Sequence, residues 1–461
     1  MFLRGFGRPP REHSVLVWNN ESAAVAAAHS VNPDRWWRSF AELLDRISPR
    51  FKRYEPRRRA AGLMLGLMSG LDRKNCWTIA EHRGDVSPDG LQHLLSRAVW
   101  DADAVRDDLR GYVVDHFGET GAVLVVDETG DVKKGVHSVG VQRQYTGTAG
   151  RIENAQVAVF LTYAAPRGHA LIDRALYVPK SWTNDPDRCA AAGIPADLAF
   201  ATKPALATAM IIAAVAAKVP ASWVAGDEVY GADPKLRATV RQAGLGYVLQ
   251  VAANRRIPTA AGPIRVDELA AALPARAWQK ASAGKGSKGE RIYSWAWVAI
   301  EAETISGETP SETGQHHLLI RRNDSTGELA YHRCYSPRPV PLMTLVKVAG
   351  QRWRIEESFQ SAKGLTGLDQ HQVRRWKSWY RWTTLAMLAH AFLAVTTADE
   401  RDQTPTPAGL IPLTVNEFRR LFDTVILASR LTMTSLISWS TWRRRHQARA
   451  RECHYRRHEQ Q

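Results

Sequence analysis

The stretch that decides how the chain is interpreted is Q-R-W-R-I-E-E-S-F-Q-S-A-K-G, residues 351–364. Its composition predicts a helix that ends at Gly364, because glycine is common directly after a helix. At about 100° per residue, four side chains fall within an arc of about 60°: Arg352, Glu356, Phe359 and Lys363. Two cations beside one acid suit a site where the bases hold phosphates and the acid holds a metal ion. A ladder of salt bridges on a solvated helix has the same spacing.

The composition favours a nucleic-acid partner. The chain has 461 residues, 44% hydrophobic and 23% charged, which is typical of a globular protein with two or three domains. A formal net charge of +16 favours a polyanion, nucleic acid before an anionic membrane. The longest apolar run, 383–395, is too short to span a bilayer. The start of the chain has no apolar signal segment, so we expect a cytoplasmic, nucleoid-associated protein with no membrane partner.

The first third of the chain has helical periodicity. Residues 1–32 are expected to form a loose arm, and residues 33–117 an all-helical domain. This domain carries basic clusters such as R-R-R at 57–59. A basic helical module predicts DNA binding, whereas a helical scaffold with a solvated basic face is the alternative.

Residues 118–251 predict the first part of a catalytic core. An apolar strand at 122–126 ends in Asp127-Glu128, and two strands with short links follow it, which predicts antiparallel pairing. A second apolar strand ends in Asp227-Glu228, and a helix and another strand come next. These elements predict an α/β fold in which a mixed sheet has helices on both faces.

The remaining residues form three predicted parts. Residues 252–342 predict a β-rich, all-strand insertion with glycine-rich turns such as A-G-K-G-S-K-G-E at 283–290. Its four strands are expected at 277–280, 292–301, 316–322 and 329–335. Residues 343–400 predict the second part of the core, and residues 401–461 a C-terminal helical segment with a basic tail.

Three acids are the candidate catalytic and metal-binding residues: Asp127, Asp227 and Glu356. Three carboxylates from strand ends and a facing helix are what two Mg²⁺ ions require for in-line phosphoryl displacement, with Mn²⁺ as a substitute. An Asp at a strand end also serves simply as a turn former. Both faces of the 122–126 strand are apolar, so alternation alone does not choose between Asp127 and Glu128.

At this point the sequence resembles the DDE transposases of insertion sequences, specifically the IS-seven-hundred-and-one branch, related to the Tn-five and IS-four type. Arg352-x3-Glu356-x6-Lys363 matches the Arg, Glu and Lys of the motif Y-x2-R-x3-E-x6-K. The blocks V-V-D-E-T-G-D-V-K-K-G at 125–135 and A-G-D-E-V-Y-G at 225–231 carry the two aspartates. Three further blocks match in order, at 138–154, 176–186 and 367–376.

The resemblance implies an RNase H-like core interrupted by a β-rich insertion. It assigns the catalytic glutamate to Glu356 rather than Glu357. It also implies a homodimer bound to terminal inverted repeats, cut-and-paste transposition and strand transfer into target DNA. The chain departs from the family pattern at two positions: the motif Tyr falls on Ala349, and His317 stands where relatives place a Trp against a flipped base.

Basic residues in the matched blocks are the candidates for DNA contact, with solvated surface as the alternative. They are Arg352, Lys363, Lys133, Lys134, Arg143, Lys180, Arg374 and Arg375. Trp182 suits either stacking on DNA or packing at a strand end. The sequence thus predicts a metal-dependent DNA transposase. The rival interpretations are a domesticated DNA-binding protein that no longer cuts and a nuclease of the same fold without strand transfer.

Overall fold

The computed structural model describes residues 32–286, 289–302, 314–404, 406, 411–427 and 442. The predicted arm before residue 32 and almost all of the predicted basic tail lie outside the described residues. The chain forms two compact units, Met1–Asp108 with Ser361–Gln461 (unit 1) and Leu109–Gln360 (unit 2). Their boundaries fall within the helices α6 (Ala102–Phe117) and α14 (Trp353–Thr366). The domain borders drawn from the sequence stay predictions.

The described part of unit 1 is helical. Its elements are α2 (Pro33–Ile47), η1 (Ser48–Arg50), α3 (Tyr54–Met68), α4 (Cys76–His82), α5 (Asp89–Ser96), α15 (Trp376–Gln403), α16 (Val415–Phe422) and the π-helical turn η3 (Asp423–Leu427). The long helix α15 packs on α2, α3, α5 and α16, so residues far apart in sequence share one core. No helix of the described part is long and apolar enough to cross a bilayer.

Buried charges in unit 1 are paired with specific acceptors and donors. Arg381 donates hydrogen bonds to the carbonyl oxygens of Leu94, Ala98 and Trp100, at 3.1, 2.6 and 2.9 Å. The indole of Trp36 donates to the buried carboxylate of Glu400 at 2.6 Å. Burial of an ionised group without such partners is strongly unfavourable, so these contacts connect α15 to the helices that precede it in the chain.

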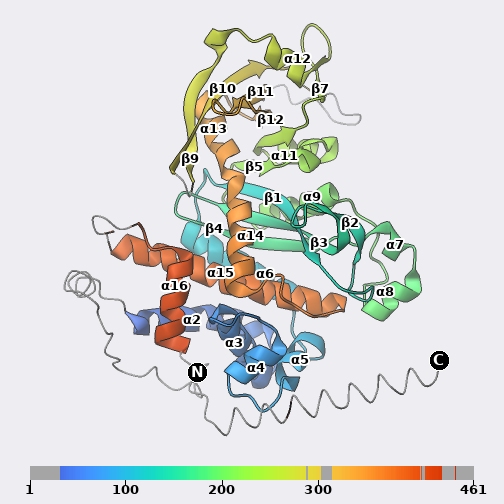
Figure 1. The fold of residues 1–461 in the computed structure, drawn as a ribbon, viewed down its shortest axis with the longest axis vertical. Coiled ribbons are helices and arrows are strands. Elements are labelled where there is room, and N and C mark those ends of the chain that lie inside the picture. Colours follow the sequence, from blue (N-terminus) through green and yellow to red (C-terminus); the bar gives the residue numbers. More distant parts are fainter. Residues whose placement is uncertain are drawn as a thin grey trace. The chain divides into compact units, whose positions relative to one another are not determined.

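Unit 2 is built on one 10-stranded mixed sheet in the order β2-β3-β1-β5-β6-β12-β11-β10-β9, with β4 paired to β3 (Figure 1). The strands are β1 (Val123–Val132), β2 (Gln142–Thr146), β3 (Arg151–Ala164), β4 (His169–Leu176), β5 (Trp223–Gly226), β6 (Gly246–Val251), β9 (Gln279–Gly286), β10 (Gly289–Ala299), β11 (Gln315–Arg322) and β12 (Leu329–Ser336). The antiparallel pairing of β3 with β1 and β4 confirms that prediction. β2 was missed because it lies in a polar, glycine-rich stretch.

The centre of the sheet is parallel because helices connect its strands. β1 pairs in parallel with β5, and β5 in parallel with β6. Parallel neighbours need a crossover connection, which α9 (Lys203–Ala216) and α11 (Pro234–Gln242) provide. Thr202 and Asp233 cap the first turns of these two helices. Other helices of unit 2 are α7 (Lys180–Thr183), α8 (Pro186–Ala192), α10 (Glu228–Gly231) and α13 (Leu342–Gln351).

The predicted insertion does not form a separate sheet. Its last strand, β12, pairs antiparallel with the core strand β6, from Tyr331 opposite Val251 to Tyr335 opposite Tyr247. β11, β10 and β9 then extend the same sheet. The chain therefore leaves the core after β6 and returns to it as β12, the strand directly beside β6.

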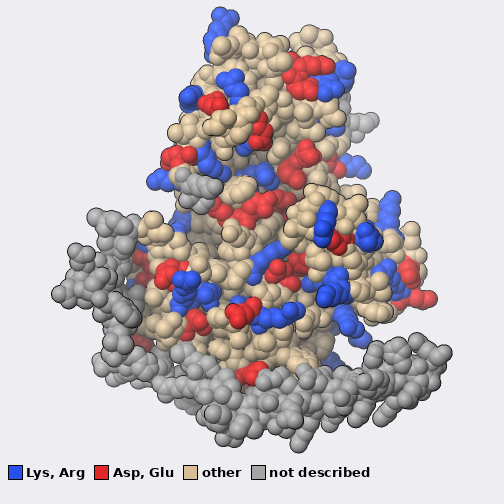
Figure 2. All heavy atoms as spheres, in the orientation of Figure 1, with Lys and Arg blue, Asp and Glu red and all other residues tan. Residues whose placement is uncertain are grey.

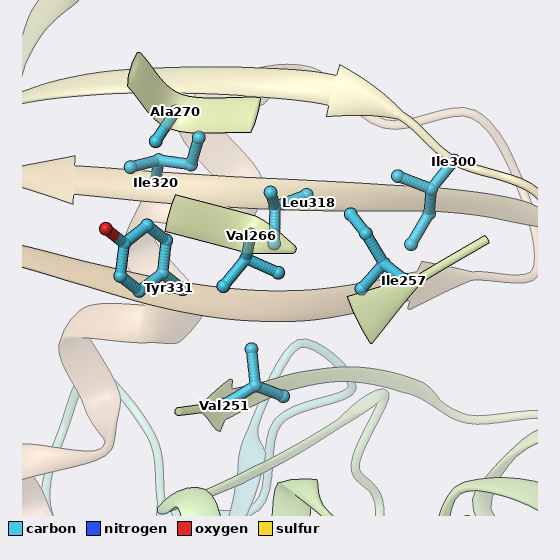
Figure 3. Packing of buried hydrophobic residues seen from close by; sticks show 8 residues of the cluster. All are labelled: Val251, Ile257, Val266, Ala270, Ile300, Leu318, Ile320 and Tyr331. Carbon is cyan, nitrogen blue, oxygen red and sulfur yellow. The ribbon is translucent and has the colours of Figure 1, made fainter. Parts of the chain in front are cut away.

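The insertion has a small apolar core of its own (Figure 3). α12 (Val266–Ala271), the short strands β7 (Arg256–Ile257) and β8 (Ile264–Arg265), and the turn η2 (Ala275–Ala277) accompany its long strands. The core residues include Ile257, Val266, Ala270, Leu318, Ile320 and Tyr331. The expectation of an all-strand block is wrong, because α12 contributes to this core.

Two local expectations also differ from the structure. The glycine-rich stretch expected to be a turn is largely strand, because β9 extends to Gly286 and β10 begins at Gly289. The helix expected over residues 351–364 begins only at Trp353, because Arg352 is the C-cap of α13. It continues to Thr366, and Gly367 with φ +60° follows it. Glycine adopts positive φ without steric cost, so Gly367 rather than Gly364 ends this helix.

We predict that His332 makes unit 2 sensitive to acid. Burial first, then the charges of Arg321 and Arg352, lower the pKa of His332 from 6.5 to about 3. Below about pH 6.5 the unfolded chain binds a proton that the folded chain does not, so stability falls as the pH falls toward 3. Between about pH 7.5 and pH 5 this loss amounts to about 2 kcal/mol.

The measurement is urea unfolding of the native protein and of His332→Gln at both pH values. The variant is expected to lose about 2 kcal/mol less than the native protein over this interval, whatever its stability at neutral pH. An equal loss in the two proteins would show that His332 is not kept neutral by the fold.

Candidate active site

The two candidate aspartates lie at the same level of the sheet. β1 and β5 are parallel and in register, with Val126 opposite Gly226. Asp127 directly follows Val126, and Asp227 directly follows Gly226. The two aspartates therefore come after the same pair of residues in the two strands. β5 ends at Gly226, and Asp227 turns the chain into α10 as its N-cap, where its Oδ1 accepts a hydrogen bond from the Val229 amide at 2.9 Å. The fold thus brings together two acids 100 residues apart.

Helix α14 lies on the Asp127 side of the sheet. The ring of Phe359 packs edge-on against Phe160 at 5.5 Å between centroids, and Phe160 pairs directly with Asp127 across β3 and β1. At the start of α14, Nη1 of Arg352 is 3.3 Å from Oδ2 of Asp127. Glu356 is one turn further along and on the same face as Arg352. The structure therefore places Glu356 on the helix that covers Asp127.

The charges at this place act strongly on each other. Asp127 is only 7% exposed. Burial first and the negative charge of Asp227 next raise the pKa of Asp127 well above its usual value, with Glu356 adding to the rise and Arg352 opposing it. Burial and the charge of Glu128 raise the pKa of Asp227. Two adjacent carboxylates in a buried position are costly to ionise, and a cation between them would relieve this cost.

Glu128 points to the other face of β1 and has separate partners. Its carboxylate is 2.7 Å from Nζ of Lys203, at the start of α9, and accepts a hydrogen bond of 2.6 Å from the hydroxyl of Tyr230, in α10. Adjacent strand residues point to opposite faces, so α9 and α14 cover opposite faces of β1. This supports the assignment of Asp127, rather than Glu128, to the site beside α14.

The donor set fits a hard divalent cation, which prefers carboxylate oxygens. Arg352 already places a positive charge against Asp127. In the described part of the chain, however, no group of three or more His, Cys, Asp or Glu side chains is placed so that it could hold a metal ion. Asp127, Asp227 and Glu356 are therefore neighbours by topology and charge without being closed around an ion position.

The predicted DNA-contact residues are divided between the units. Lys133 and Lys134 follow β1, Arg143 is on β2 and Lys180 begins α7, all in unit 2. Lys134, Arg143 and Lys180 are exposed, whereas Lys133 is half-buried with Asp131 at 3.9 Å. Lys363, Arg374 and Arg375 belong to unit 1, where the two arginines are exposed at the start of α15. On the face drawn in Figure 2, cations and acids are interspersed.

Several residues of the site were not singled out from the sequence. Tyr230 and Lys203 hold Glu128, and His169 contacts α14. Tyr230 is part of the quoted block A-G-D-E-V-Y-G, but its buried hydrogen bond could not be seen there. Trp182 is buried, and its indole donates to the Val141 carbonyl at 2.8 Å. The packing alternative for Trp182 is therefore the correct one.

The fold is that of a mixed α/β protein with one acid, Asp127, inside β1 directly after its pairing with β5, and another, Asp227, directly after β5. The expectation that the first strand ends at Asp127 is wrong, because β1 continues to Val132 in its pairing with β3. This chain belongs to the DDE superfamily endonucleases: the family model with that description matches residues 46–289, more than half of the chain. The matched region contains both aspartates and ends before Glu356.

Two individual proteins are similar to this chain. A probable transposase for insertion sequence element IS701 from Microchaete diplosiphon is 26% identical over 198 residues, 42% of this chain and 49% of that protein. The chain thus spans about half the length of this relative, and the match confirms the resemblance stated from the motifs. A piggyBac transposase in a synaptic complex with hairpin DNA is similar at 11% identity and a TM-score of 0.40, over 89% of this chain and 85% of that one.

We predict that Tyr230→Phe destabilises unit 2 by about 2 kcal/mol, because it removes a buried hydrogen bond to a charged acceptor. The measurement is the free energy of unfolding in urea. The control is Tyr145→Phe, on a side chain that is 64% exposed, for which a change below about 0.5 kcal/mol is expected. Equal effects of the two substitutions would show that the bond to Glu128 contributes nothing.

Proposed function

We propose that this protein is a DNA transposase of an insertion sequence, and that Asp127, Asp227 and Glu356 are its catalytic carboxylates. The observation that carries the proposal is the parallel register of β1 and β5, in which Asp127 and Asp227 each follow the last paired residue. The family membership and the motif order support it. The RNase H-like topology and the β-rich insertion belong to the same proposal.

The three carboxylates would hold two Mg²⁺ ions, or Mn²⁺ in their place. When bound, such ions increase the acidity of a water or a 3′-hydroxyl and stabilise the leaving oxygen. Asp127 and Asp227 hold their positions through the strand pair, and α14 presents Glu356 to them. Arg352, which contacts Asp127 in the free protein, is placed to hold a phosphate once DNA is present.

The reaction is proposed in two displacements at phosphorus. A water oxygen first attacks the phosphodiester at the transposon end, and the 3′-oxygen leaves with a proton. That 3′-hydroxyl then attacks a phosphodiester of target DNA, so one bond forms as one breaks in each step. Binding of terminal inverted repeats by a homodimer, with the helical residues 33–117 contributing DNA contacts, completes the proposed cut-and-paste pathway.

Cleavage of a DNA end by the purified protein tests the catalytic assignment. DNA carrying the inverted repeats that flank the gene is incubated with Mg²⁺ and native protein, Asp127→Ala, Asp227→Ala or Glu356→Ala. Each substitution is expected to lower the cleavage rate about a thousand-fold, since metal-supported stabilisation of the transition state is worth several kcal/mol. Glu228→Ala, an exposed acid beside Asp227, is the control and should cleave normally.

Undiminished cleavage by the three variants would overturn the assignment. Cleavage by native protein without joining to target DNA would indicate a nuclease of the same fold. Binding to the ends without cleavage by native protein would indicate a domesticated DNA-binding protein.

Exposed cations of unit 2 are expected to make the binding of duplex DNA depend on salt. Each phosphate contact contributes about −0.9 to the slope of log K against log salt concentration. The combined substitution of Lys134, Arg143 and Lys180 by Ala should therefore reduce this slope by about 3. The measurement is fluorescence anisotropy with a labelled duplex over a salt series without divalent ions.

The matched control replaces three other exposed cations of unit 2, Lys235, Arg256 and Arg276, by Ala. It removes the same net charge at positions where no contact is proposed. An equal reduction in slope for both triple variants would show that the effect is one of overall charge, and the proposed contacts would be wrong.

A further inference from the structure

Each of the three proposed catalytic acids is followed in the sequence by a second acid. These three second acids differ in their burial and in their contacts. Glu128 and Glu228 follow the two aspartates, and Glu357 follows Glu356. Glu228 is exposed, and Glu128 points away from α14. Glu357 is half-buried and lies in a network that joins α14 to the sheet.

The network is defined by four short contacts. Oε2 of Glu357 is 2.7 Å from Nη1 of Arg354 and 3.3 Å from Nε2 of His169, the first residue of β4. Nδ1 of His169 is 2.8 Å from the hydroxyl of Ser358, which donates to the carbonyl of Arg354 at 2.9 Å. Because the Ser358 proton is used in this way, Nδ1 of His169 is the donor to Ser358. One imidazole thus bridges two successive residues of α14.

These contacts fix α14 at a second point. The first point is Arg352 against Asp127, and the packing of Phe359 on Phe160 lies beyond the network along the helix. Two attachments on one helix determine its rotation as well as its position, whereas a single attachment would allow it to turn. Glu356 lies between them in the sequence. Its direction relative to Asp127 therefore depends on both.

The charge state of Glu357 agrees with an anchoring role. Burial alone would raise its pKa, but hydrogen bonds from His169 and Arg354 outweigh burial and lower the pKa to about 2. Glu357 is consequently an anion whose charge is used within the network. A carboxylate that already interacts with Arg354 and His169 is a poor competitor for a metal ion next to it.

We propose that Glu357 and His169 are positioning residues that hold Glu356 in the direction required for metal binding. This inference rests on the proposed function, because it assumes that Asp127 and Glu356 share an ion. It adds that the second acid of the E-E pair acts through the helix and does not itself touch the ion or the DNA.

The test measures Mn²⁺ binding to the full-length protein by electron paramagnetic resonance of the free ion, without DNA and without turnover. Glu357→Gln is expected to weaken binding about 10-fold, the loss usual for groups that orient metal ligands. Glu228→Gln removes the same charge next to Asp227 and should stay within about twofold of native protein. The difference between these variants separates orientation from simple loss of negative charge.

The variant His169→Ala distinguishes the two explanations, a change of charge and a loss of orientation, because they predict opposite changes in Mn²⁺ affinity. Removing a cationic or neutral donor near the site would strengthen or leave unchanged the binding of a divalent cation if only charge mattered. If His169 orients α14, its removal weakens Mn²⁺ binding about 10-fold. The double variant with Glu357→Gln should lose no more than the worse single variant, because both residues belong to one network.

The outcomes are distinguishable from failure of the proposed function. If Asp127→Ala abolishes Mn²⁺ binding while Glu357→Gln and His169→Ala bind normally, the positioning role is wrong and the catalytic site stands. If Asp127→Ala binds as the native protein does, both proposals are overturned. Should His169→Ala fail to fold, His169→Gln, whose amide retains one donor to Glu357, is expected to bind within about threefold of native protein.

Discussion

The proximity of a buried carboxylate, Asp127, to a half-buried one, Asp227, is the constraint that the rest of unit 2 accommodates. Burial first and the charge of Asp227 next raise the pKa of Asp127, while burial and the charge of Glu128 raise the pKa of Asp227. The fold offsets part of the cost of ionising these acids with one guanidinium, that of Arg352, and with backbone donors at the start of α10. A protein that needed only stability would gain by replacing such a pair with apolar side chains. Acids with raised pKa values on two central strands of the sheet therefore support the proposed site.

Buried charges elsewhere in the structure are handled differently. Arg381 has three carbonyl acceptors, and Glu400 has an indole donor and the guanidinium of Arg35. Glu128, only one residue from Asp127, is bound by Lys203 and Tyr230. These groups connect elements and are satisfied within the protein. Asp127, in contrast, has the negative charge of Asp227 near it, and this difference distinguishes Glu128, a structural acid, from its neighbour Asp127, the proposed catalytic acid.

The insertion explains how a third acid distant in sequence returns to the same place. β6 leaves the core and β12 comes back beside it, so the intervening residues extend the sheet without separating its two parts. α13 then packs on β1, β5 and β6 and leads directly into α14. The pairing of β12 with β6 and the packing of α13 on the sheet therefore set where α14 begins.

The sequence by itself determined the apolar strand segments that lead to Asp127 and Asp227, the helix that carries Glu356, the mixed sheet and the family. It did not determine that β1 continues through Asp127 to Val132, or that Arg352 lies between α13 and α14. Apolar runs and helical spacing are local signals, and a chain shows them without folding. It did not determine which acid of a pair faces α14, because both sides of β1 are apolar. Nor did it show β2, α12, the end of α14 at Thr366 or the contacts of His169 and Tyr230. These depend on hydrogen bonds and packing between residues far apart in the chain, and only the tertiary structure brings such residues within reach.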